Sequence, residues 1–218
     1  MNIDLSKNEE SELQMESLGE KIETIIEKLP PTEVTLVEIM DIVGADSLLL
    51  LTVFLSLVFL VPVSIPGVST VFGSAILLVG ITRLFSRKLW LPEKIGTRKL
   101  SAEKLREGFK KALVWFRRLE KVSRPHRMSG LTTEGAMTVF NNLSFILAAV
   151  LLMAPFGFIP FSNTLPAVAL IFLAIGMMQR DGVSILLGNL SNIATIVYFG
   201  FLIAGGGWSI GEFIKLLG

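Results

Sequence analysis

The stretch FLVPVSIPGVSTVFG, residues 59–73, interrupts an apolar segment with two prolines and several small polar residues. A later stretch, LMAPFGFIPFSNTLPA, residues 152–167, interrupts a second apolar segment in the same way. Both contain the pattern Pro-x-x-x-Thr, from Pro66 to Thr70 and from Pro160 to Thr164. A simple membrane anchor needs neither helix breakers nor hydroxyl groups at its centre. We therefore interpret the two stretches as paired breaks in membrane-embedded helices.

The charge pattern around these breaks predicts an integral membrane protein. Residues 47–82, 135–179 and 182–211 form uncharged blocks of 36, 45 and 30 residues. A membrane-spanning helix needs about 20 apolar residues, so each block exceeds that length. No signal peptide precedes the first block, and we expect the internal blocks to direct insertion.

The first block is too short for two complete spans and a turn, which need more than about 40 residues. Its first arm, residues 48–61, would measure about 21 Å as a helix, less than the membrane core of about 30 Å. We expect a re-entrant hairpin here and a repeated one in the second long block. Ser69 or Thr70 would cap the returning helix, whose N-terminus could attract an anionic group. Alternatively, these side chains only satisfy backbone groups freed by the break.

The near-neutral net charge of +1 hides two segments of opposite charge. Residues 1–46 carry 3 Lys and 12 Asp or Glu, whereas residues 83–127 carry 15 Lys or Arg and 4 Glu. Basic segments beside membrane spans stay in the cytoplasm, so we place the N-terminus and residues 83–130 there. The acidic segment predicts two helices, over residues 9–29 and after Thr32. They form either a docking module for a partner or, as we prefer, a pair that packs on the rest of the protein.

Residues 102–122 predict a basic amphipathic helix, with Ser101 as its N-cap. Such a helix is typical of an anionic membrane surface, and no nucleic-acid-binding motif accompanies its charges. The predicted membrane-surface residues are Arg83, Arg87, Lys88, Lys110, Lys111, Arg117 and Arg118.

Residues 183–206 are long enough for one transmembrane helix, with Asn189, Asn192 and Thr195 at helical spacing. These groups would mediate helix packing or line the cavity that the two breaks face. The tail from residue 205 predicts a short separate helix at the membrane boundary.

Catalytic signals are absent from the sequence. It has no cysteine and a single histidine, His126, which supports neither a transition-metal site nor a catalytic triad. GWSIG, residues 207–211, has the G-x-S-x-G spacing of a nucleophile elbow, but no strand precedes it. We expect no enzyme activity, no metal and no cofactor.

Several segments resemble the ExoD family of bacterial membrane proteins: VPVSIPGVSTVFG, RKLWLP at 87–92, RPHR at 124–127 and IPFSNTLPAVALIFLAIGMMQRDG at 159–182. The resemblance covers roughly residues 17–205. It implies an inner-membrane protein associated with exopolysaccharide synthesis, and it carries over no catalytic residues. The matched motif positions are Pro62, Pro66, Gly67, Ser69, Thr70, Gly73, Pro155, Pro160, Asn163, Thr164, Pro166, Arg180 and Asp181.

The predicted fold is an all-α membrane protein with two repeated re-entrant hairpins, a basic interfacial helix between them and a C-terminal span. Its segments are residues 1–46, 47–82, 83–134, 135–180 and 181–218. A competing arrangement has the two repeats in inverted orientation. Because one subunit has little protein to cover both turns, we expect a homodimer.

Two functional hypotheses follow, and an enzyme that acts on lipid-linked sugars ranks third behind them. The first is transport of an anionic solute or a lipid-linked saccharide, bound by Pro66, Ser69, Thr70, Pro160, Asn163, Thr164, Asn189 and Asn192. The second is a non-catalytic scaffold that assembles polysaccharide-synthesis proteins or shapes the bilayer.

Overall fold

The computed structural model describes residues 18–43, 46–60, 67–85, 97, 99–120, 123, 127–132, 135–154, 156 and 159–217. Some predicted features lie outside these residues: the helix start at residues 9–17, Pro62, Pro66, Arg87, Lys88, His126 and Pro155. The fold is all-α, as predicted, with one short two-stranded sheet. In chain order the elements are α2 (Leu18–Lys28), β1 (Glu33–Thr35), α3 (Leu36–Val43), α4 (Ser47–Leu57), η2 (Val58–Leu60), α5 (Val68–Leu84), β2 (Lys99–Ser101), α7 (Ala102–Glu120), η3 (Ser129–Leu131), α8 (Ala136–Leu152), α9 (Thr164–Gln179) and α10 (Gly182–Leu217).

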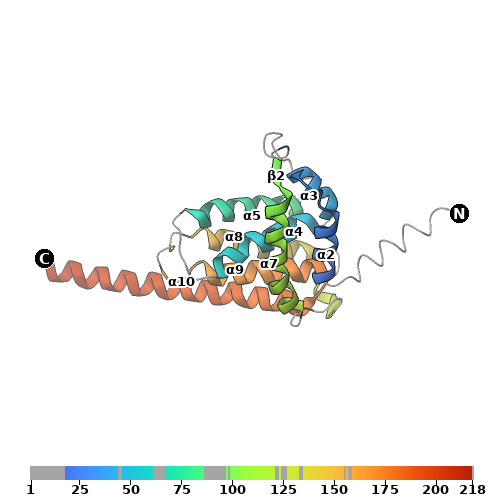
Figure 1. Ribbon diagram of the computed structural model, residues 1–218. Coiled ribbons are helices and arrows are strands. Elements are labelled where there is room, and N and C mark those ends of the chain that lie inside the picture. The colour runs from blue at the N-terminus through green and yellow to red at the C-terminus, as the bar shows by residue number, and fades with distance from the viewer. Residues whose placement is uncertain are drawn as a thin grey trace.

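Five helices lie side by side in one bundle (Figure 1). Helices α4 and α5 form a first hairpin, and α8 and α9 form a second. Each helix of the first hairpin packs on one helix of the second: α5 lies on α8, and α4 lies on α9. Helix α10 then packs along α9 and, less extensively, along α8.

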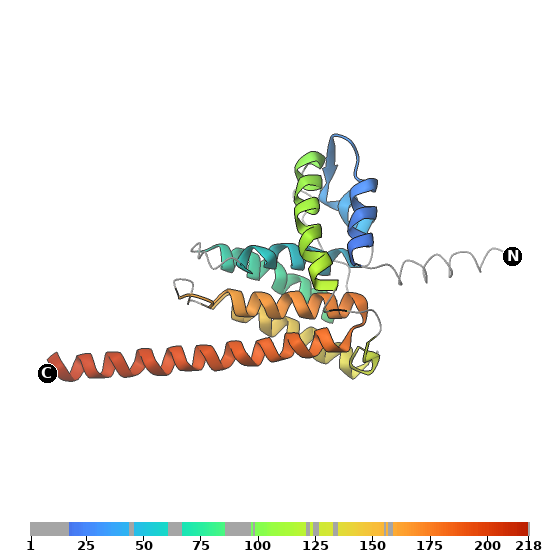
Figure 2. The same ribbon diagram turned by 60° about the horizontal axis from the view of Figure 1, so that its bottom comes forward.

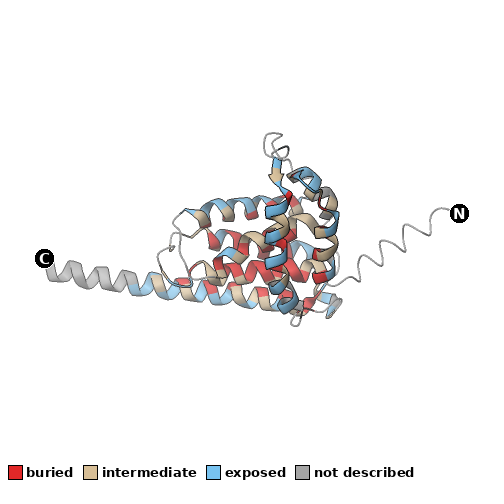
Figure 3. Ribbon diagram, viewed as in Figure 1, coloured by how far each residue is buried: buried red, intermediate tan, exposed pale blue. Residues whose placement is uncertain are grey.

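Helix α9 occupies the centre of the bundle, and most of its residues are buried (Figure 3). It carries no charged residue and is apolar on all sides, a composition that suits a helix surrounded by others. Glycine allows α10 to approach it closely. A Cβ on Gly188 would lie 2.6 Å from Leu173 Cγ, and a Cβ on Gly176 would lie 2.9 Å from the backbone nitrogen of Ile185.

Helix α10 is the one described helix that is long and apolar enough to cross a membrane, over Gly182–Gly205. Only 28% of its most apolar window is buried, so it is not a core helix of the bundle. This agrees with the predicted span at residues 183–206. The tail is helical, as expected, but it continues α10 without interruption to Leu217 and projects beyond the bundle (Figure 1), and its position at a membrane boundary stays a prediction.

The other bundle helices are shorter than a full crossing. The longest, α5 and α8, have 17 residues each, which corresponds to about 26 Å. The expected short arms are therefore present, while their insertion in a membrane stays a prediction. Large apolar side chains are exposed on the outer faces of α5, α8 and α10, including Val71, Leu78, Ile81, Phe140, Leu143, Leu147, Val150, Leu190, Ile193 and Phe201.

A second unit, formed by α2, β1, α3, β2 and α7, joins the acidic and basic segments of the chain. Strands β1 and β2 pair antiparallel, with Glu33 opposite Ser101, and Lys99 Nζ lies 2.9 Å from Glu33 Oε2. Arg106 of α7 donates to the carbonyl oxygen of Leu29 at 3.0 Å. The opposite charges of the two segments thus contribute to their packing. Figure 2 shows α7 and α2 standing across the direction of the bundle helices.

The apolar face of α7 is covered by protein. Ala102, Phe109 and Ala112 are buried, and the Phe109 ring packs edge-on against Phe54 of α4 at 4.8 Å between centroids. We expected this face to lie on the membrane surface, and instead it packs on α2, with Phe109 also contacting Phe54 of α4.

Two predicted helix caps have different outcomes. Ser101 does cap α7, because its Oγ accepts from the amide of Lys104 at 3.4 Å. Thr32 does not begin the second N-terminal helix. Thr35 caps α3 instead, in a capping box in which the amide of Thr35 donates to Glu38 Oε2 at 2.8 Å and the amide of Glu38 donates to Thr35 Oγ1 at 3.3 Å.

Candidate functional site

The turns of the two hairpins lie at the same end of the bundle. Thr164, the first residue of α9, donates its hydroxyl to the carbonyl oxygen of Phe59 in η2 at 2.9 Å. At the start of α5, a Cβ on Gly73 would collide with Met153, the residue that follows α8. Each returning helix therefore begins beside the end of the other hairpin's first arm. Both hairpins have the same orientation in the bundle, which excludes the inverted arrangement.

The two turns also share a backbone feature. Gly67 follows Pro66 and has a φ of +83°, and Phe161 follows Pro160 and has a φ of +63°. In each case the carbonyl oxygen of this left-handed residue accepts the amide four residues later, at 3.1 Å for Val71 and 3.1 Å for Leu165. The two Pro-x-x-x-Thr patterns thus share a left-handed residue and its hydrogen bond, although α5 begins at Val68 and α9 begins only at Thr164.

The predicted caps at the first turn are wrong. The N-cap of α5 is Gly67, so Ser69 and Thr70 both lie inside the helix. Ser69 is 6% exposed and Thr70 is exposed. A left-handed glycine starts the helix here, and no side chain caps it.

The second turn is held by contacts to η2 and α10. Asn163 occupies the N-cap position of α9 without a side-chain hydrogen bond to the helix. Pro160 is exposed, and its carbonyl oxygen accepts the hydroxyl of Tyr198 from α10 at 2.7 Å. Because Thr164 already bonds to Phe59, its hydroxyl serves packing. Among the described residues at this end, the side chains of Thr70 and Asn163 form no hydrogen bond.

The predicted residues on α10 do not join the turns. Asn189 donates to the carbonyl oxygen of Ile185 in its own helix at 2.9 Å, and Asn192 is 3% exposed and donates to the carbonyl oxygen of Ser144 on α8 at 2.9 Å. Asn192 precedes Tyr198 by six residues, or about 9 Å along the helix. These asparagines therefore belong to the middle of the bundle.

The basic residues predicted to bind a membrane surface lie on two elements. Lys110, Lys111, Arg117 and Arg118 are exposed on α7, where Arg117 also forms an ion pair with Glu23 of α2. Arg83 lies in the last turn of α5 and is half-buried, and its Nε is buried without a hydrogen-bond partner among the described residues. Membrane-surface binding by these side chains stays a prediction.

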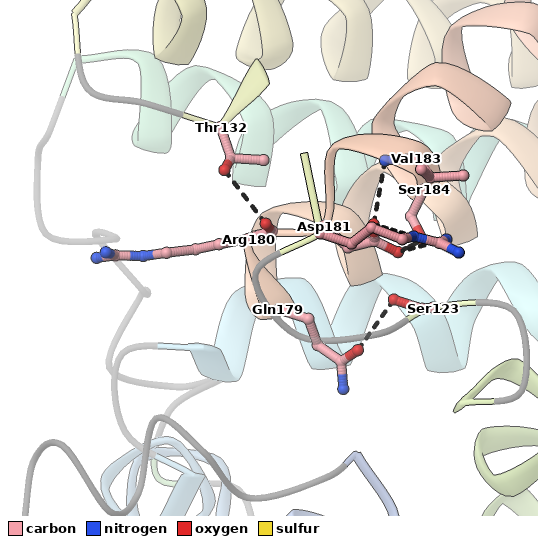
Figure 4. Close-up of polar contacts among 8 residues, drawn as sticks. Ser123, Thr132, Gln179, Arg180, Asp181, Val183 and Ser184 are labelled. Carbon is pink, nitrogen blue, oxygen red and sulfur yellow. Dashed lines mark hydrogen bonds and ion pairs between the residues drawn. The ribbon is translucent and has the colours of Figure 1, made fainter. Parts of the chain in front are cut away.

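A charged cluster that the sequence did not reveal lies at the opposite end of the bundle (Figure 4). Asp181, between α9 and α10, is fully buried and accepts from Arg127 Nε and Nη2, both at 3.3 Å. It also accepts the hydroxyl of Ser184 at 2.8 Å and the amide of Val183 at 3.1 Å. Burial alone would raise the pKa of Asp181, but these hydrogen bonds, that of Ser184 first, outweigh it and lower the pKa below its ordinary value.

Neighbouring contacts fasten the segment before α8 to the α9–α10 junction. The amide of Gly182 donates to the carbonyl oxygen of Arg127 at 2.7 Å, and Ser123 Oγ donates to Gln179 Oε1 at 2.9 Å. Thr132 Oγ1 donates to the carbonyl oxygen of Arg180 at 3.3 Å, and Arg180 itself ends α9 with a φ of +52°. In the sequence, Arg180 and Asp181 stood out only as positions of the ExoD-like motif and by their place between two uncharged blocks.

Within the described residues, no three His, Asp or Glu side chains gather as metal ligands would. The arrangement is therefore two polar regions at opposite ends of an apolar bundle: the hairpin turns, and the Asp181 cluster of Arg127, Asp181 and Ser184.

Comparison with known proteins places the chain in a family. The sequence profile described as "Exopolysaccharide synthesis, ExoD" matches residues 18–201. The chain is 41% identical over 186 residues to Protein ExoD of Rhizobium meliloti (strain 1021), and the aligned region covers 85% of this chain and 77% of that protein. It is 29% identical over 191 residues to an uncharacterized protein of Synechocystis sp., covering 84% of this chain and 86% of the relative. No solved structure matches it. The chain belongs to the ExoD family of exopolysaccharide-synthesis proteins.

Proposed function

We propose that this protein is an inner-membrane component of exopolysaccharide synthesis that moves an anionic solute or a lipid-linked saccharide, with the paired hairpin turns as its working end. The observation that carries the proposal is the hydrogen bond from Thr164 to Phe59, which brings the two turns to one end of the bundle. A single ligand could therefore contact both hairpins.

Membrane insertion is supported by the outer faces of α5, α8 and α10. Soluble monomers rarely expose apolar side chains over so large a connected surface, whereas lipid covers such a surface without cost. Phe201 is 74% exposed and Leu190 is 62% exposed on α10. In the orientation that we propose, the axis of the helix bundle lies close to the membrane normal.

The same orientation places each end of the helix bundle on one side of the membrane. Helix α7 crosses the bundle direction, so it would run parallel to the membrane surface, with Lys110 and Lys111 exposed towards anionic headgroups (Figure 2). This end, with the Asp181 cluster, is cytoplasmic in the proposal. The arms of about 26 Å would then carry the turns towards the opposite face of the membrane core.

Sidedness can be tested directly, because the sequence contains no cysteine. A cysteine at Lys111 should react with a membrane-impermeant maleimide only from the cytoplasmic side. A cysteine at Asn163 should stay protected from that side. Equal labelling of both positions in intact cells would contradict the orientation.

The transport role is tested by replacing polar side chains at the two turns, with Thr164 as the control position. Thr70→Val and Asn163→Leu change side chains that make no side-chain hydrogen bond within the described chain, so the purified variants should fold like the wild type. In proteoliposomes, we expect both to reduce movement of a polyprenyl-phosphate-linked sugar at least tenfold. Thr164→Val is the matched control, since it removes the bond to Phe59 and should lower stability. Wild-type transport by folded Thr70→Val and Asn163→Leu would refute the role of the turns.

A further inference from the structure

Two buried asparagines, Asn141 on α8 and Asn192 on α10, each have one oxygen atom without a partner among the described residues. Asn141 and Asn192 are both 3% exposed. Asn141 Nδ2 donates to the carbonyl oxygen of Leu131 at 2.9 Å, and Asn192 Nδ2 donates to that of Ser144 at 2.9 Å. A carbonyl oxygen accepts only from the nitrogen of a carboxamide, so these bonds identify the other atom as oxygen. Both Oδ1 atoms are buried and have no partner among the described residues.

Asn141 is connected to the start of α10 through Leu131, and Asn192 is connected to α8 through the Ser144 carbonyl. Asn141 and Ser144 are three residues apart and so lie on the same face of α8. Asn192 reaches this face from α10. Leu131, which accepts from Asn141, lies 3.1 Å from the position of a Cβ on Gly182, the first residue of α10. We call Asn141, Ser144 and Asn192 the amide seam; it begins beside the Asp181 cluster and extends to the middle of the bundle.

The chemistry of the unpaired atoms defines what can bind them. Both are hydrogen-bond acceptors, while the amide nitrogens of Asn141 and Asn192 are already occupied. Leaving a buried acceptor unpaired is costly, and buried polar groups in folded proteins almost always have a partner. An anion offers no donor to these oxygens. A hydroxyl group does, and it can bond to a neutral carboxamide without bringing charge into an apolar bundle.

We propose that the amide seam binds hydroxyl groups, supplied either by a saccharide or by buried water. The seam is separate from the hairpin turns, because Asn192 lies about 9 Å before the α10 residue that contacts the second turn. The inference rests on the proposed function only in choosing sugars as probes. Its chemistry would hold equally for a protein that transports nothing.

The test compares the wild type with Asn192→Leu, using the full chain in lipid nanodiscs. The Ser144 carbonyl also lies within regular α8, so losing Asn192 Nδ2 leaves no backbone group unpaired. Asn192→Ala, which adds no bulk, is a second variant that covers a failure of the first to fold. Asn189→Leu is the matched control, since Asn189 bonds within its own helix.

Two signals distinguish the sources of the hydroxyl group. The first is a rise in melting temperature with glucose, galactose or cellobiose, which would identify a saccharide. The second is X-ray radiolytic labelling of seam-lining side chains without sugar, which would identify buried water. We expect at least one signal in the wild type and in Asn189→Leu, reduced at least fivefold in the folded Asn192 variant. If neither signal depends on Asn192, the seam is dry and the proposal is wrong. That result would leave the Thr70 and Asn163 transport test unaffected.

Discussion

Replacing Asp181 with asparagine should destabilise the protein although the two side chains have the same shape. The carboxamide would keep an oxygen for the amide of Val183, but it would present an NH2 group where Asp181 accepts from Arg127 and Ser184. Removing one partner of a buried ion pair costs about 3–5 kcal/mol. The Arg127 side chain is 36% exposed and can be solvated by water, so we expect a loss of about 2–3 kcal/mol in the free energy of unfolding.

A double-mutant cycle with Arg127→Gln separates this ion pair from other effects. Arg127→Gln leaves a fully buried carboxylate without its cation and should cost about 3 kcal/mol. The double variant should be less destabilised than the two losses added together, with a coupling energy of about 1–3 kcal/mol. Chemical unfolding in nanodiscs, followed by the loss of helical circular dichroism, measures all four proteins. Arg180→Gln, which changes the exposed neighbouring side chain, is the control and should stay within about 0.5 kcal/mol.

The same pair predicts a dependence on acid. Because the folded pKa of Asp181 is lowered, its ionised form stabilises the folded state. This contribution is complete above the ordinary carboxyl pKa of about 3.9, and it is lost as the pH falls through the lower folded value. The wild type should therefore lose more stability than Asp181→Asn as the pH falls below about 4. Parallel acid profiles, or additive losses in the cycle, would refute the assignment of Asp181 as a buried, ion-paired carboxylate.

Three further changes test packing elsewhere in the fold. Gly188→Leu should abolish the close contact of α10 with Leu173 and cost at least about 3 kcal/mol, measured by chemical unfolding, with a smaller loss for alanine. Phe109→Ala removes a buried ring that contacts Phe54 and should cost about 3–4 kcal/mol and increase proteolysis of α7; an unchanged protease pattern would contradict its packing on the bundle. Arg180→Gly should raise the melting temperature by a few degrees, because glycine adopts a φ of +52° without strain, whereas a lower value would indicate that the arginine side chain stabilises this junction.

Helix positions could be predicted from the sequence because local signals determine them. The uncharged blocks and their prolines predicted the arms that became α4, α5, α8 and α9, and the predicted span at residues 183–206 lies within α10. Caps were less certain, since several hydroxyl side chains compete within a few residues. Thr35 caps α3 where Thr32 was expected, because Thr35 has a glutamate three residues later that completes the capping box.

Long-range partners could not be predicted. Arg127 and Asp181 are 54 residues apart, and no local pattern connects them. The apolar stripe of α7 shows a related limit. An amphipathic helix must cover its apolar face, but the stripe is the same whether lipid or protein does so. The ring of Phe54 on α4 covers Phe109, and this contact follows from the tertiary fold alone.

The arrangement of the hairpins allows the contacts of the two turns to be compared. Exchanging the hairpins converts the α5–α8 contact into the α9–α4 contact, so the helices of the two hairpins have corresponding packing partners. Under this exchange Thr164 corresponds to Thr70, since each is the fourth residue after its proline. Yet Thr164 bonds to Phe59, while Thr70 is exposed. The second turn is also tied to α10 through Tyr198. The described contacts of the two turns therefore differ: the second turn bonds to η2 and α10, whereas the Thr70 side chain forms no hydrogen bond with the described residues.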